Sequence, residues 1–148
     1  MKSFSFALFL GFACLVVGVL IGCSPPAPVT MDSLPLATGA QPTTNGPYVQ
    51  LKNTVTDGLK NAQGVQIDNI DSRIYTLDKT ATWNDVQTLY DTQLNKGDWK
   101  TDPKLTVANA SVHGKGWLRG QQVFAVFFIS DPNIPDVLLL TALGTVKQ

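Results

Sequence analysis

The sequence predicts an α+β domain: an antiparallel sheet of about four strands with two helices packed on one face. Two stretches, residues 47–64 and 83–96, place apolar side chains at helical spacing. From residue 104 onward, the pattern changes to β-branched and aromatic runs separated by glycine and proline. Residues 47–148 are enough for one modest hydrophobic core, so we expect a single domain there.

Composition narrows the classes of function. The 148 residues carry 11 Lys and Arg against 11 acidic residues, all of them Asp, and one His. This balance argues against a strongly basic nucleic-acid-binding protein. No cysteine follows Cys23, so the folded part has too few soft ligands for a Cys/His zinc site. We therefore expect no metal, no cofactor and no nucleic-acid partner.

The chain begins with an apolar run. Lys2 is the only charged residue before Asp32, and residues 4–22 are almost all apolar or small. A short basic region followed by such a run is typical of a signal peptide. The run is also close to the roughly 20 residues that span a bilayer, so hydropathy alone leaves an anchor helix as the alternative.

The run ends in Leu20-Ile21-Gly22-Cys23, which resembles the bacterial lipobox. The resemblance implies cleavage before Cys23 and lipidation of its thiol, with residues 1–22 as the signal peptide. Two acyl chains anchor a protein stably, whereas one is marginal. With a lipid or with an uncleaved anchor helix, the domain is predicted to lie in the cell envelope, tethered to a membrane and outside the cytoplasm.

Residues 23–46 are predicted to be a lipidated cysteine followed by a linker. Prolines 25, 26, 28, 35 and 42 oppose both helix and sheet. We expect an extended, semi-flexible segment that holds the domain several nanometres from the bilayer.

The first helix is predicted to begin at Pro47, in the first turn, and to end near Gly64. Gly58 weakens it by about 1 kcal/mol relative to alanine. The residues on its apolar face are spaced 3, 4, 4 and 3 apart. They are Tyr48, Leu51, Val55, Leu59 and Ala62.

A strand over residues 72–77, with a shorter piece at 65–67, is predicted next. The second helix spans 83–96, with Thr82 as N-cap and Asp85 three residues later. Gly97 is the expected C-cap, and Trp99 is expected to fold back on the last turn.

Three more strands are predicted at 111–119, 122–130 and 137–146. Gly114 and Gly116 suggest a bulge or an irregular edge in the first of them. A tight turn at Gly120 and Gln121 joins it to the second. The strand 122–130 is apolar without alternation, so we expect both of its faces to be covered, the second by the linker, a partner or another copy.

The stretch 83–143 carries a further resemblance. An aromatic helix face that ends in Gly97-Asp98-Trp99 is followed by Trp117-Leu118-Arg119-Gly120-Gln121-Gln122. This pattern is similar to that of small uncharacterised bacterial envelope lipoproteins. The resemblance implies no activity and brings no catalytic residues.

Candidate catalytic groups are few. Ser111 and His113 would share one face of a strand, which suits nucleophilic chemistry, but there is no G-x-S-x-G elbow. Asp68 and Asp71 are the closest acid pair for glycoside cleavage and, with Asn69, for calcium. Turn-forming residues on a solvated surface are the favoured interpretation of these three.

The aromatic residues are the remaining candidates for binding. An exposed pair of Trp99 and Trp117 beside Arg119 would make a partner-binding or sugar-stacking patch. Ordinary core and cap packing is the favoured alternative, because both tryptophans adjoin glycine turns.

Together these features predict a membrane-anchored envelope lipoprotein with a non-catalytic binding or structural domain and an envelope protein as its partner. Two alternatives remain. One is a carrier of an apolar small ligand held between helices and sheet. The other is a small envelope hydrolase that uses Asp residues and His113.

Overall fold

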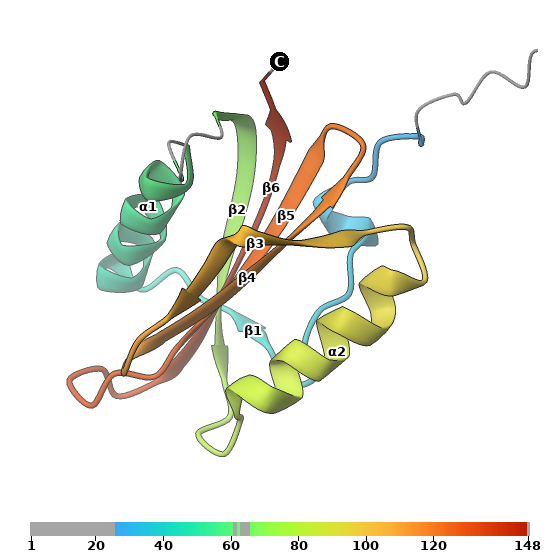
Figure 1. The fold of residues 1–148 in the computed structure, drawn as a ribbon. Helices are drawn as coiled ribbons and strands as arrows, with labels where there is room; N and C mark the ends of the chain where they lie inside the picture. Colours follow the sequence, from blue (N-terminus) through green and yellow to red (C-terminus); the bar gives the residue numbers. More distant parts are fainter. Residues whose placement is uncertain (1–25, 61, 63–65, 148) are drawn as a thin grey trace, which may run out of the picture.

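The computed structural model describes residues 26–60, 62 and 66–147. Within that part, the fold is α+β, with an antiparallel six-stranded sheet in the order β1-β2-β6-β5-β4-β3 (Figure 1). The strands are β1 Gln41–Pro42, β2 Ile67–Leu77, β3 Lys100–Ala108, β4 Val112–Arg119, β5 Gln122–Ile129 and β6 Val137–Val146. The helices are the 3₁₀ turn η1 Met31–Ser33, α1 Gly46–Lys60 and α2 Trp83–Asn95.

The expectation of about four strands was wrong, because the sheet has six. The two additional strands, β1 and β3, lie at its two edges. β1 has only two residues, and in β3 only Leu105 is buried. Neither strand therefore shows the apolar alternation that predicts a strand. Pro103 in β3 fits an edge position, because proline cannot donate to a ladder.

The two strand pieces expected before the second helix are one strand. β2 runs without a break from Ile67 to Leu77 and pairs with β6, with a register shift between Asp68 and Asp71. Asn69 has a φ of 52°, the left-handed backbone that asparagine tolerates better than most residues. The polar residues that suggested a gap thus form a β-bulge. Residue 65 of the shorter piece lies outside the described residues.

The two helices lie on opposite faces of the sheet, not on one face as expected (Figure 1). Alternate residues of β5 point to opposite sides. Phe124, Val126 and Phe128 cluster with α2, and Val123, Ala125 and Phe127 cluster with Leu59 of α1. The strand that lacks alternation is buried on both faces because each helix covers one of them.

The segment expected to be a linker instead packs on the sheet where the structure describes it. Met31 and Ala37 are buried in the α2-side core, and β1 pairs with β2. Arg73 Nη1 donates to Asp32 at 2.5 Å, and this bond with the Arg73 charge lowers the pKa of Asp32. The prolines keep this stretch extended, but its apolar side chains cover the part of that face over β2 and β6.

The ends of α2 are close to the prediction. Thr82 Oγ1 accepts from the Asp85 backbone N–H at 3.3 Å and donates to the Asp85 carboxylate at 2.6 Å. At the other end, the left-handed residue is Asp98, with φ 63°, and not Gly97. Trp99 folds back as expected, since its backbone N–H donates to the carbonyl of Leu94.

The strand around residues 111–119 is not an edge strand, because β4 pairs with β3 and with β5. Its glycines make room for large neighbours. A Cβ on Gly114 would lie 2.6 Å from the Phe127 ring, and one on Gly116 would lie 2.5 Å from Leu105. The two-residue turn at Gly120 and Gln121 is confirmed, with Gly120 at φ 59°.

Candidate functional site

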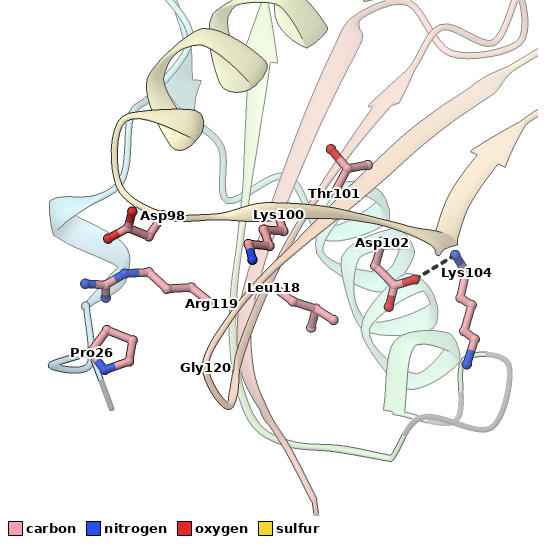
Figure 2. A pocket seen from close by; sticks show the side chains of 9 residues that line it. All are labelled: Pro26, Asp98, Lys100, Thr101, Asp102, Lys104, Leu118, Arg119 and Gly120. Atoms are coloured by element: carbon pink, nitrogen blue, oxygen red, sulfur yellow. Dashed lines mark hydrogen bonds between the residues drawn. The ribbon is translucent and has the colours of Figure 1, made fainter. Parts of the chain in front are cut away.

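An open polar pocket of about 860 Å³ lies beside the β4–β5 hairpin, where β3 and the N-terminal segment approach it (Figure 2). Its walls come from three parts of the chain that are far apart in sequence. The lining residues are Pro26, Asp98, Lys100, Thr101, Asp102, Lys104, Leu118, Arg119 and Gly120.

Cations exceed anions in the lining of this polar pocket. Lys100, Lys104 and Arg119 face two carboxylates, Asp98 and Asp102. One of those carboxylates is engaged locally, because Asp102 Oδ1 accepts from the backbone N–H of Lys104 at 2.9 Å (Figure 2). Three cations against two carboxylates leave one excess positive charge in the lining, which suits an anionic group.

Arg119 joins this pocket to the N-terminal segment. Its Nη1 donates to the carbonyl of Ala27 at 2.7 Å, while its Nε is buried and has no hydrogen-bond partner among the described residues. Next to it, the Gln122 side chain accepts from Val29 N at 2.8 Å and donates to Val29 O at 2.9 Å. These contacts hold residues 27–29 against the hairpin.

The predicted aromatic patch is not formed, because Trp99 is only 4% exposed and Trp117 is fully buried. Trp99 meets Phe124 edge-on, and Trp117 stacks near the same ring. The favoured alternative, core packing, is what the structure shows. Arg119 lines the polar pocket without either tryptophan, and with Trp99 it also borders a separate small cavity of about 180 Å³ beside the N-terminal segment.

A second hollow is an apolar groove of about 360 Å³ on the α1 side of the sheet. Lys104 is the one charged residue among the described residues that line it. The lining comes from α1 and the residues just after it, from β3, and from single residues of β4 and β5. These residues are Val55, Gly58, Leu59, Ala62, Lys104, Leu105, Val107, Val112 and Phe127.

The apolar groove results from uneven coverage of the two sheet faces. On the α2 side, α2 and the N-terminal segment both contribute to the core that covers the sheet. On the other side, α1 packs chiefly against β2, which lies toward the opposite edge of the sheet from β3. Val107 is accordingly 40% exposed, although it is a large apolar residue. Apolar surface left open in this way is typical of a binding site.

The proposed catalytic pair has other partners. His113 stacks on Trp83, with ring centroids 5.8 Å apart and 14° between the planes. Ser111 faces Asp131, whose pKa is lowered by hydrogen bonds from the backbone and side chain of Asn133 and from Ser111. Neither residue lines the polar pocket or the apolar groove.

Asp68 and Asp71 flank the β2 bulge and pair with basic residues. Asp71 lies 3.4 Å from Arg73, and Asp68 lies 3.8 Å from Lys147. Among the described residues, no group of three or more His, Cys, Asp or Glu side chains converges to hold a metal ion. The acid-pair and calcium hypotheses therefore gain no support from their surroundings.

The sequence interpretation missed most residues of both hollows. Lys100, Lys104 and Val107 belong to β3, a strand whose exposed and charged residues show no periodic pattern. The recurring cations of that stretch were the only available signal. Cys23 and the rest of the lipobox lie outside the described residues. No helix in the described part of the chain combines the length and the apolar character needed to cross a bilayer.

Comparisons with known protein families, curated proteins and solved structures found no match to this chain.

Proposed function

We propose that this chain is an envelope lipoprotein, anchored through lipid on Cys23, whose domain carries an apolar small ligand without chemical conversion. The apolar groove is the observation that supports the binding role. Its volume, about 360 Å³, lies within the range of small-molecule sites.

The lining of the groove favours an acyl chain with an anionic head. Val55, Leu59, Leu105 and Phe127 offer apolar walls that suit a hydrocarbon chain. Lys104 can neutralise a carboxylate or phosphate at the mouth. A long-chain fatty acid has both features, and a membrane-tethered domain would meet such molecules at the bilayer.

Two other interpretations have less support. A protein-binding patch at Trp99 and Trp117 would require exposed side chains, and both are buried. A hydrolase that uses His113 would require a nucleophile or acid beside it, and the partner observed is the Trp83 ring.

The anchor is tested by comparing two cysteine variants of the full chain in a bacterial host. Cys23→Ser is expected to abolish incorporation of labelled palmitate and to leave residues 1–22 uncleaved, as read from the intact mass. Cys14→Ser, which alters the only other cysteine, is expected to leave both unchanged. Palmitate labelling of the Cys23→Ser variant would contradict the anchor.

The groove is tested with cis-parinaric acid, a fluorescent fatty acid. A Cβ at Gly58 meets no atom within 4 Å, so Gly58→Leu fills groove space without a clash and should weaken binding by about tenfold. Gly46→Leu is the matched control, because a Cβ at Gly46 also meets no atom within 4 Å but Gly46 does not line the groove. Equal affinity in both variants, or no binding to the unaltered protein, would reject the groove as the site.

The role of Lys104 is separated from that of the walls by a neutral probe. Lys104→Gln is expected to weaken binding of parinaric acid and to leave binding of its methyl ester unchanged. A similar loss for both probes would show that the substitution disturbs the groove itself.

A further inference from the structure

We infer that the polar pocket beside the β4–β5 hairpin lies on the bilayer surface and binds lipid headgroup phosphates through Lys100 and Lys104. The inference rests on the proposed lipidation of Cys23. It concerns a different hollow from the apolar groove, although Lys104 lines both, and it assigns the orientation of the domain on its membrane.

The first argument is where the N-terminal segment is held. Arg119 binds the carbonyl of Ala27, and Gln122 binds both backbone groups of Val29. The Pro26 ring packs against the hairpin turn, 3.4 Å from where a Cβ on Gly120 would lie. Met31 then enters the core. Residues 26–29 are thus fixed to the hairpin end of the sheet, and the chain continues from there toward the middle of the sheet.

The second argument is the length of chain before that point. Pro26 is three residues after Cys23, and three residues span about 10 Å at most. A lipid on Cys23 would therefore hold the hairpin within about 10 Å of the bilayer surface. The long, free tether expected from the prolines is incompatible with this attachment.

The third argument is charge. Pro26, the described residue nearest to Cys23, itself lines the polar pocket, together with Lys100, Lys104 and Arg119. The whole chain has no net charge, so a lining with three cations and two carboxylates is a local positive excess. Lysine side chains near an anionic bilayer are attracted to its phosphates. Arg119 is already engaged with Ala27, which leaves the two lysines for the headgroups.

The orientation is tested with nitroxide labels on the lipidated full-length protein. With Cys14 lost in the signal peptide and Cys23 capped by lipid, an introduced cysteine is the sole free thiol. Gln121→Cys labels the hairpin turn, and Asn133→Cys labels the loop at the other end of β5. The eight residues of β5 separate the two positions by about 26 Å at about 3.3 Å per residue.

The vesicles contain phosphatidylethanolamine and phosphatidylglycerol, with a nickel-chelating lipid that relaxes nearby nitroxides. We expect relaxation at residue 121 to exceed that at 133 by about threefold, because the hairpin faces the lipid. The double variant Lys100→Gln, Lys104→Gln should lower this ratio, because it removes both proposed phosphate ligands. The control double variant Lys52→Gln, Lys60→Gln on α1 should leave the ratio unchanged.

The outcomes distinguish the orientation, the phosphate contact and the lipid anchor from one another. Equal relaxation at 121 and 133 in protein that carries the lipid overturns the orientation and leaves the anchor intact. An unchanged ratio in the folded Lys100 and Lys104 variant overturns the phosphate contact. Absence of lipid on Cys23, read from the intact mass, overturns the anchor and with it this inference.

Discussion

Asp91 explains how a tryptophan can be completely buried beside a helix. Its carboxylate accepts from Trp117 Nε1 at 3.2 Å, from Lys115 Nζ at 2.8 Å and from Gln87 Nε2 at 3.4 Å. The indole N–H is thereby satisfied where water is excluded. One carboxylate on α2 thus joins the helix to β4.

Replacement of Asp91 by alanine should lower the free energy of unfolding by about 1–3 kcal/mol, because the Trp117 N–H loses its acceptor inside the protein. Chemical denaturation monitored by tryptophan fluorescence measures the change. Asp57→Ala is the matched control on α1, where the Asp57–Lys60 pair is exposed, and its effect should stay within about 0.5 kcal/mol. Equal effects of the two substitutions would contradict the role given to Asp91.

At the scale of elements, the sequence was informative where burial is periodic. Residues 83–96 were predicted to be helical, and α2 ends one residue earlier. The strands predicted at 122–130 and 137–146 match β5 and β6 closely for a different reason, because nearly all their residues are buried and each strand is an unbroken apolar run. β3 was missed because eight of its nine residues are not buried, so no apolar pattern marks it.

The N-cap of α2 gives a prediction at this scale. Thr82→Ala removes the acceptor for the Asp85 N–H and should cost about 1 kcal/mol of stability. Thr92→Ala, in the exposed interior of the same helix, should leave stability unchanged or raise it slightly. Thermal unfolding of the two variants distinguishes them, and a larger loss for Thr92→Ala would be inconsistent with the cap.

For the whole molecule, the largest difference from the sequence interpretation concerns residues 26–46. Local composition favours an unstructured linker there, since proline opposes regular structure. In the structure, Met31 and Ala37 complete the α2-side core, and the described fold therefore begins before Pro47. This segment is held by contacts with residues that are distant in the chain. Asp32 binds Arg73, 41 positions away, and Met31 accepts from Thr141, 110 positions away.

Met31→Ala should therefore destabilise the entire domain by about 2–5 kcal/mol, as expected for truncation of a buried methionine. Leu36→Ala, in the same segment but 46% exposed, should change stability by less than about 0.5 kcal/mol. Denaturant unfolding of both variants provides the measurement. A negligible effect of Met31→Ala would mean that the segment is a linker after all.

Local sequence was enough to predict both helices from their apolar periodicity and β5 from its unbroken apolar run. It also predicted the Thr82 cap and the hairpin turn at Gly120 from single residues. Tertiary structure alone decided that the helices lie on opposite faces, that Trp99 and Trp117 are buried, and that β3 places Lys104 and Val107 beside α1. The physical reason is the distance along the chain over which each kind of interaction acts. Caps and periodicity depend on residues a few positions apart, whereas the covering of a face depends on which distant segment packs there with the most apolar surface.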